Sequence, residues 1–226
     1  MKLNSNQKEL CKNIDYSFQN LYLLEQALIH SSLKSRGHNN NQRMEFLGDR
    51  ILGFVISDYL FNHYPKWREG DLALNYNALV CKETCSEIAE QIGLGQSLIM
   101  GKSESKHGGR LKKAILADAI EALIAAVYLD SKLSTVKHLI LKLWSSKLNN
   151  VGDIELDPKT ALQHWVQEKK GGLPNYTDMK REGSDHDPIF YVEVKLENGL
   201  SAIGKDKSKR KAQQNAAQKL LSKIKN

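Results

Sequence analysis

The sequence of 226 residues contains no long apolar run. No segment approaches the roughly 18 to 20 apolar residues that a membrane-spanning helix needs, and the first residues, MKLNSNQKELCKN, lack the apolar stretch of a signal peptide. We therefore expect a cytoplasmic protein without a membrane partner. The length and a hydrophobic content of 41% are sufficient for two domains with apolar cores.

Cysteine is scarce, with Cys11, Cys81 and Cys85 as its three occurrences. An odd number without a disulfide framework fits a reducing compartment. Cys81 and Cys85 are one helical turn apart, but no second Cys or His pair at ligand spacing accompanies them. This pattern disfavours a zinc site and predicts buried free thiols.

Positive charge is unevenly distributed along the chain. Residues 157–226 carry 14 Lys or Arg against 9 Asp or Glu, whereas residues 1–156 carry 19 against 17. The last third of the chain is therefore its basic part. Such an excess has two interpretations, a binding surface for a polyanion such as nucleic acid or a contribution to solubility.

Apolar residues recur at three- and four-residue intervals from residue 4 to about residue 149, which predicts about seven helices and an all-α domain over residues 1–149. Breaks fall at residues 36–41, at Pro65, at residues 93–95 and at residues 101–109. The last break, GKSESKHGG, is predicted to be a loop, either mobile or a plain surface connection.

The helical periodicity lapses at residues 150–156, which we interpret as an interdomain linker. Residues 157–226 then predict a small α+β domain with the order α-β-β-β-α. Asn198-Gly199 is a strong hairpin signal between two of its strands. The predicted elements are a helix that ends at residues 171–172, strands at residues 175–181, 189–196 and 200–204, and a helix at residues 209–224.

Two pairs of carboxylates stand out in the helical part. Glu45 and Asp49 lie in NQRMEFLGDRIL, residues 41–52, and Asp118 and Glu121 lie in ILADAIEALIAA, residues 115–126. Spacings of four and three residues place each pair on one helix face, where like charges destabilise a helix by a few tenths of a kcal/mol. The pairs are either surface accidents or parts of one site in which something compensates the repulsion.

The apolar neighbours of these carboxylates favour a site. Buried carboxylates without partners would protonate or destabilise the fold, and a divalent cation bound by oxygen atoms holds several of them together. Oxygen ligands suit Mg²⁺, with Mn²⁺ as a substitute, better than zinc.

The C-terminal domain resembles the double-stranded RNA-binding domain. Gln163 is predicted to face outward on the first helix, His186 lies in the turn GSDHDPIF, and Lys209, Arg210 and Lys211 open the last helix, whose amino-terminal amides attract phosphate. The resemblance implies that these five residues contact the RNA. Such domains recognise the shape of the A-form duplex through 2′-hydroxyls and phosphates.

The segment NQRMEFLGDRIL, with its EFLGD core, resembles the signature of bacterial ribonuclease III, and LADAIEALI matches the second acidic motif of that family. The resemblance covers the whole chain, from the endonuclease domain through the linker to the RNA-binding domain. It implies that Glu45, Asp49, Asp118 and Glu121 form a magnesium-binding catalytic cluster that hydrolyses the backbone of double-stranded RNA. The products would carry 5′-phosphate and 3′-hydroxyl ends with short 3′ overhangs.

Two further positions are compared with the family. Glu69, in REGDL, matches an accessory family carboxylate, although the segment also reads as an ordinary helix start. Gln42 is a departure, because many members carry Glu there. That position is accessory in the family, so we expect the activity to survive.

The resemblance also implies a homodimer that processes ribosomal RNA precursors and structured messenger and transfer RNA transcripts. Phe46, Leu47, Ile51 and Phe54 could form the dimer interface or belong to the core of one chain. The alternative functions are a non-catalytic dimer that binds double-stranded RNA and a metal-dependent hydrolase of small phosphorylated substrates. Retention of all four carboxylates disfavours the first, and the RNA-binding module disfavours the second.

Overall fold

The computed structural model describes residues 2–33, 39–151, 158–169, 171–184 and 187–225. Its internal contacts divide the chain into two units, Met1–Gly152 and Asp153–Asn226. The division falls inside the segment predicted as a linker. Residues 152–157 lie outside the described residues, so the linker stays a prediction. The two units are described separately below.

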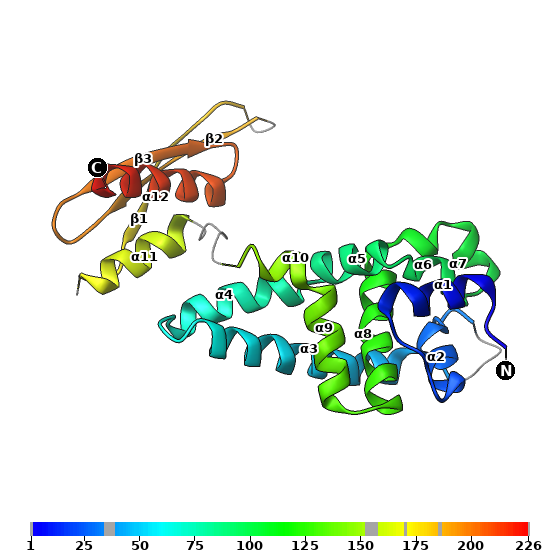
Figure 1. Cartoon of the computed structure of the whole chain (residues 1–226). Coiled ribbons are helices and arrows are strands. Elements are labelled where there is room, and N and C mark those ends of the chain that lie inside the picture. The colour runs from blue at the N-terminus through cyan, green and yellow to red at the C-terminus, as the bar shows by residue number, and fades with distance from the viewer. Residues whose placement is uncertain (1, 34–38, 152–157, 170, 185–186, 226) are drawn as a thin grey trace. The chain divides into compact units, whose positions relative to one another are not determined.

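The first unit is built from α-helices, as the sequence predicted (Figure 1). Among its described residues, seven helices have eight residues or more: α1 (Ser5–Ile14), α2 (Leu21–Leu28), α3 (Gln42–His63), α4 (Glu69–Val80), α5 (Lys82–Gln91), α8 (Lys113–Asp130) and α9 (Leu133–Leu143).

Three shorter helices were not predicted: α6 (Leu94–Ser97), α7 (Lys102–Lys106) and α10 (Ser145–Leu148). The prediction of a loop at residues 101–109 is therefore wrong in part, because α7 lies within it and the 3₁₀ helix η2 (Gly109–Leu111) begins there. A single turn of four or five residues is too short to show helical periodicity in a sequence.

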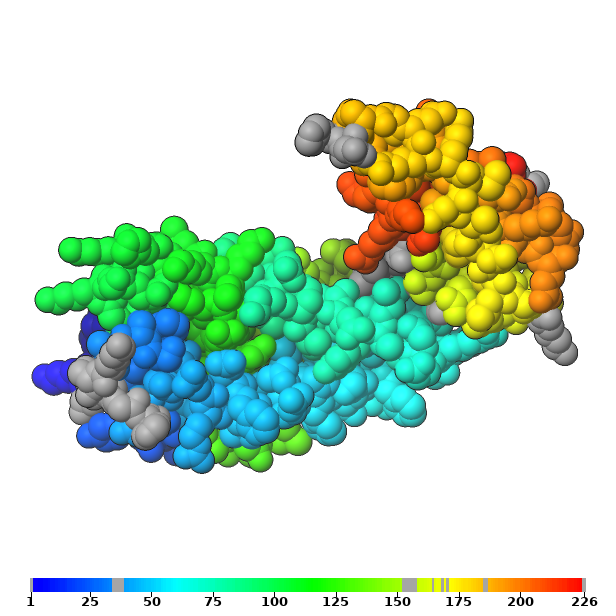
Figure 2. Space-filling model, turned by 180° about the vertical axis from the view of Figure 1, so that it is seen from behind, coloured from blue at the N-terminus to red at the C-terminus, as the bar shows by residue number. Residues whose placement is uncertain are grey.

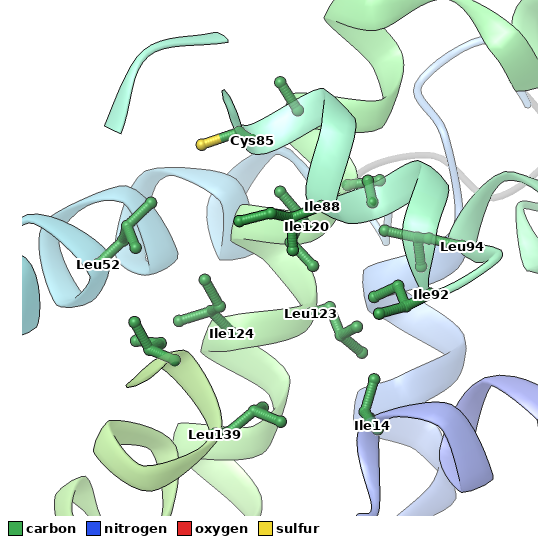
Figure 3. Close-up of a cluster of buried hydrophobic side chains, with 14 of the residues drawn as sticks. Ile14, Leu52, Cys85, Ile88, Ile92, Leu94, Ile120, Leu123, Ile124 and Leu139 are labelled. Carbon is green, nitrogen blue, oxygen red and sulfur yellow. The ribbon is translucent and has the colours of Figure 1, made fainter. Parts of the chain in front are cut away.

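Helix α8 is the central helix of this unit. It packs against α2, α3, α5 and α9. From residue 115 to residue 127 every side chain of α8 is buried except those of Asp118 and Glu121, which are half-buried. Figure 3 shows Ile120, Leu123 and Ile124 of α8 in the surrounding apolar core. A helix that is apolar on nearly all sides needs such a surrounded position.

The second unit has the predicted order α-β-β-β-α. Its elements are α11 (Pro158–Glu168), β1 (Asn175–Glu182), β2 (Ile189–Lys195), β3 (Ser201–Asp206) and α12 (Lys209–Lys225). The strands form one antiparallel sheet in the order β1-β2-β3. The predicted hairpin at Asn198-Gly199 is confirmed, because the Leu196 amide donates to the Leu200 carbonyl oxygen over 2.8 Å and Gly199 has a φ of 86°.

Helix α12 packs closely on the sheet because small residues face it. Ala212, Ala216 and Ala217 are fully buried. A side chain at Gly204 of β3 would place its Cβ 2.2 Å from both the Ala212 carbonyl oxygen and the Ala216 amide nitrogen. The fold class predicted from the sequence is thus confirmed for both units.

Within the described residues, no helix combines the length and the apolar character needed to cross a bilayer.

Candidate active site

The four predicted carboxylates come from two helices that pack directly on each other. Glu45 and Asp49 lie on the first part of α3, and Asp118 and Glu121 lie on the first half of α8. All four side chains are half-buried. The buried faces of both helices therefore present carboxylates toward a shared region, as the spacing in the sequence predicted.

Gly48 explains how the two helices approach so closely. A Cβ atom at this position would lie 1.8 Å from the carbonyl oxygen of Glu121 and 2.5 Å from its carbonyl carbon. Both contacts are with backbone, which has no flexible end that could move aside. The glycine of the EFLGD segment thus allows α3 to bring Glu45 and Asp49 next to α8.

The electrostatics of the site show that the four carboxylates act on one another. Burial, followed by the negative charges of Asp49, Glu45 and Asp118, raises the pKa of Glu121 from its ordinary value of 4.5 to about 7. Burial also raises the pKa of Glu45, with Asp118 as the next contribution and Asp49 as a smaller one. The carboxylates therefore form one cluster of like charge.

The cluster offers oxygen ligands of the kind that magnesium and manganese prefer. With the side chains as they lie, however, no group of three or more His, Cys, Asp or Glu residues in the described part of the chain is arranged to hold a metal ion. The Asp49 carboxylate instead forms an ion pair with Arg50, with 3.0 Å between Oδ2 and Nη1. The donor chemistry fits a divalent cation, and ligation would require the side chain of Asp49 to turn from Arg50.

Glu69 lies outside this cluster but close to one of its members. It is the exposed first residue of α4. Together with Asp49 it lines an open groove of about 680 Å³ between α3 and α4. Gln42, the departure from the family pattern, is the exposed first residue of α3 and accepts a hydrogen bond from the side chain of Asn40 over 3.3 Å.

Four apolar residues of α3, which the sequence could not assign to the core or to a dimer interface, differ in their exposure. Ile51 is 7% exposed and belongs to the core, and Leu47 is partly buried against it. Phe46 and Phe54, in contrast, are 66% and 54% exposed. Residues of α3 and α4, light blue to cyan in Figure 2, lie at the surface of the unit. Phe54 and Phe61 line the groove itself.

The corner between α4 and α5, which was not predicted as part of the site, also borders the cluster. Cys85 is fully buried there, as predicted, whereas Cys81 is only partly buried, so the prediction of two buried thiols is wrong for Cys81. Burial, then the charge of Glu121, raises the pKa of Cys85 to about 12. The positive charge of Lys82, the exposed first residue of α5, opposes the rise in pKa of Glu45 and Glu121. The sequence carries one signal for Lys82. A lysine in the first turn of a helix opposes the helix dipole, which indicates a negative group nearby.

In the second unit, the predicted RNA-contact residues that the structure describes lie at the surface. Gln163 is exposed on α11, and Lys209, Arg210 and Lys211 are exposed in the first turn of α12. Lys209 forms an ion pair with Asp178 of β1 over 2.5 Å. His186 lies outside the described residues.

Comparison with known proteins gives the same two modules. Residues 20–148 match the family model described as ribonuclease-III-like, and residues 158–224 match the double-stranded RNA binding motif.

Curated relatives match nearly the whole chain. "Ribonuclease 3" of Dinoroseobacter shibae is 46% identical over 224 residues, which cover 99% of this chain and 98% of the relative. "Ribonuclease 3" of Jannaschia sp. is 46% identical over 211 residues, which cover 93% of each.

Solved structures agree with these matches. A nuclease domain of ribonuclease III from Campylobacter jejuni has a TM-score of 0.60 and 37% identity, and the match covers 64% of this chain and 97% of that domain. Another structure of this nuclease domain, with a TM-score of 0.59, 37% identity and coverage of 62% and 96%, is described as showing structural flexibility in a region involved in dimer formation. This chain therefore belongs to the ribonuclease III family and is an endoribonuclease for double-stranded RNA.

Proposed function

We propose that Glu45, Asp49, Asp118 and Glu121 are the catalytic residues with which this enzyme hydrolyses phosphodiester bonds of double-stranded RNA. The observation that carries the proposal is the gathering of the four carboxylates of α3 and α8 in one half-buried cluster on otherwise apolar helix faces. Like charges gathered in such surroundings oppose folding, so a role outside stability accounts for their presence.

The family is metal-dependent, and we propose Mg²⁺ as the ion, with Mn²⁺ as a substitute, held by the same four carboxylates. When bound, the cation supplies an activated water molecule and stabilises charge on the phosphate oxygens. Hydrolysis as a whole would join the oxygen of a water molecule to phosphorus and break the bond between phosphorus and the 3′ oxygen, which takes up a proton. The products then carry 5′-phosphate and 3′-hydroxyl ends.

The residues around the cluster have their own roles in this proposal. The half-buried carboxylates of Glu45 and Glu121 would orient ligands from a fixed position, because their helices are packed against several others. Asp49, whose side chain is 39% exposed, faces the groove and can leave Arg50 for the cluster. Glu69, on the same groove, is an accessory carboxylate that acts near the scissile strand.

The second unit is proposed to bind the RNA duplex. The exposed residues Gln163, Lys209, Arg210 and Lys211 are proposed to contact 2′-hydroxyls and phosphates, with His186 as a further contact from the sequence. Because Lys209 is paired with Asp178, its contact with RNA would replace an existing ion pair on the surface. The salt dependence of RNA binding tests these contacts.

We further propose a homodimer that uses the groove between α3 and α4. Exposed Phe46, Phe54 and Phe61 are unusual on a surface in contact with water, and the groove beside them is large enough to receive apolar side chains from a second copy. Two catalytic centres would then cut the two strands with a two-nucleotide 3′ overhang. Sedimentation that shows a monomer at the concentrations at which RNA is cut would contradict the dimer.

In the cell we propose a cytoplasmic enzyme that matures ribosomal RNA precursors and cuts structured messenger and transfer RNA transcripts. A domain that recognises the shape of the duplex, with little readout of particular bases, supports action on several classes of structured transcript. Cleavage of duplex segments in transcripts isolated from cells that lack the enzyme would identify the natural sites.

The catalytic assignment is tested with long duplex RNA and the variants Asp49→Asn and Glu121→Gln, each with and without Mg²⁺. Each substitution removes one negative charge but keeps the size of the side chain. We expect RNA binding in every case, and cleavage reduced on the order of 100-fold or more in both variants. A variant that cuts at the wild-type rate would show that its carboxylate is not catalytic.

A further inference from the structure

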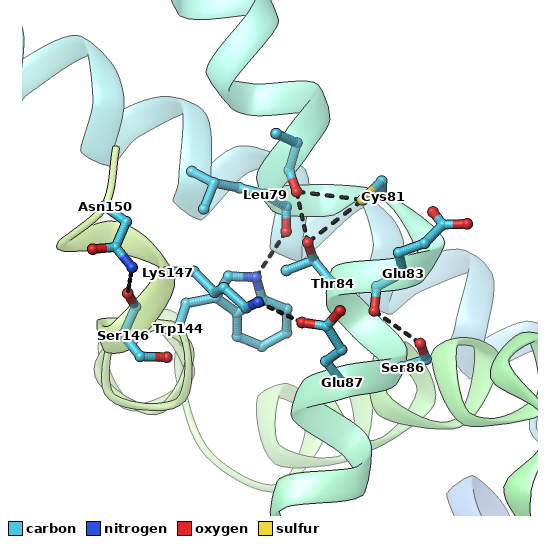
Figure 4. Close-up of polar contacts among 11 residues, drawn as sticks. Leu79, Cys81, Glu83, Thr84, Ser86, Glu87, Trp144, Ser146, Lys147 and Asn150 are labelled. Atoms are coloured by element: carbon cyan, nitrogen blue, oxygen red, sulfur yellow. Dashed lines mark hydrogen bonds and ion pairs between the residues drawn. The ribbon is translucent and has the colours of Figure 1, made fainter. Parts of the chain in front are cut away.

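Side-chain hydrogen bonds hold the corner between α4 and α5 (Figure 4). The corner leads into α5, which packs on α8, the helix that carries Asp118 and Glu121. The buried indole of Trp144 donates to the Leu79 carbonyl oxygen over 2.8 Å. The hydroxyl of Thr84 donates to the Ala78 carbonyl oxygen over 2.7 Å, and the Cys81 thiol donates to the same oxygen over 3.3 Å. These bonds satisfy backbone carbonyls at the end of α4 and fix the start of α5.

The first turn of α5 faces the cluster with two side chains. Lys82 and Cys85 are three residues apart and therefore lie on the same face of the helix. Cys85 is the inner one, fully buried and within the field of Glu121 and Asp49. Lys82 is the outer one, exposed to solvent and one turn closer to the start of the helix.

The charge of Lys82 reaches carboxylates on both catalytic helices. It acts on Glu45 of α3 and on Glu121 of α8. Lys82 forms no ion pair within the described residues that would turn it away from the cluster. An ammonium group near these carboxylates can attract a phosphate of the duplex, whose backbone is an array of negative charges.

We propose that Lys82 is a further RNA-contact residue of the catalytic centre, which binds a phosphate of the strand being cut and offsets its repulsion by the carboxylate cluster. The inference rests on the proposed catalytic function of that cluster. The positive charge of Lys82 would hold the phosphodiester next to groups that would otherwise repel it, and the hydrogen-bonded corner fixes the backbone from which the lysine side chain extends.

The test uses the full-length protein with Lys82→Gln, which removes the charge, and Lys82→Arg, which keeps it. Lys132→Gln is the matched control, because Lys132 is also an exposed lysine at the start of a helix but lies beyond the opposite end of α8. Single-turnover cleavage of a duplex RNA is measured with Mg²⁺, and RNA binding is measured over a series of salt concentrations in a Glu121→Gln background.

We expect Lys82→Gln to reduce cleavage about 10- to 100-fold and to lower the slope of log affinity against log salt by about one, the value for one lost phosphate contact. Lys82→Arg should keep the cleavage rate and the salt slope close to those of the wild type, and Lys132→Gln should change neither of them. Melting temperatures close to wild type are expected for all three, because the substituted lysines are exposed. Lys82→Ala repeats the test with the aliphatic part of the lysine side chain removed as well.

Two results would overturn the proposal. Wild-type cleavage by Lys82→Gln would exclude a role at the centre, and slow cleavage with an unchanged salt slope would show that Lys82 acts on the carboxylates alone. Failure of the catalytic cluster itself is recognised separately, because Asp49→Asn would then cut RNA as fast as wild type.

Discussion

At the residue scale, the site combines groups that the sequence identifies with groups that it conceals. The four carboxylates could be predicted because each pair repeats with helical spacing among apolar residues, which is a local pattern. The lysine at the start of α5 is a local signal, but the closeness of Lys82 and Cys85 to Glu121 could not be predicted, because it depends on how α5 packs on α8. The ion pair of Asp49 with its neighbour Arg50 is likewise a matter of side-chain rotamers.

Glu121 makes the stability of the metal-free protein depend on pH. Its pKa is about 7 in the folded chain against an ordinary value of 4.5, so as pH rises the unfolded chain releases this proton first. Stability from this group is therefore present below about pH 4.5 and is lost as pH rises through 7. We expect Glu121→Gln to stabilise the protein by about 1–2 kcal/mol at pH 8 and by much less at pH 5.

Thermal unfolding in the presence of a chelator measures this difference. Glu90→Gln, a change of an exposed carboxylate on α5, is the control and should have little effect at either pH. Equal melting temperatures of wild type and Glu121→Gln at pH 8 would mean that Glu121 does not experience the burial and repulsion described above.

At the element scale, the helices long enough to show periodicity were predicted and the single turns were not. The strands and the hairpin of the second unit were predicted to within about two residues, because alternation and Asn198-Gly199 are local signals. The distance between α3 and α8 has no such signal. It depends on one glycine, Gly48, whose role becomes visible only when the two helices are seen in contact.

Gly48→Ala should separate these two helices. The added Cβ would lie 1.8 Å from the Glu121 carbonyl oxygen, so α3 must shift and carry Glu45 and Asp49 with it. We expect a loss of about 3 kcal/mol or more in urea denaturation and a loss of cleavage at temperatures where the variant is still folded. Gly108→Ala is the control. Gly108 has a φ of 73° and open space around it, so its substitution should cost about 1 kcal/mol and leave cleavage intact.

At the scale of the whole molecule, the excess of positive charge and the excess of buried carboxylates belong to different units. The basic residues of α12 and the acidic cluster of α3 and α8 carry opposite charges, and we propose that each acts on a different part of one substrate. The order of elements was enough to predict both modules, because each has a recognisable pattern of its own. The arrangement of the modules on RNA has no equivalent in the sequence.

Binding and cutting should therefore be separable. Changing Lys209, Arg210 and Lys211 together to Ala should weaken binding of unrelated duplex RNAs to a similar extent and lower the salt slope by up to about three, one for each phosphate contact. Cleavage at saturating RNA should remain, because the carboxylate cluster is untouched. The double change of Lys219 and Lys223 to Ala, further along the same helix, is the control for lost charge, since these side chains donate to carbonyl oxygens of β3. Unchanged affinity of the triple variant in a filter-binding titration would remove the start of α12 from the RNA interface.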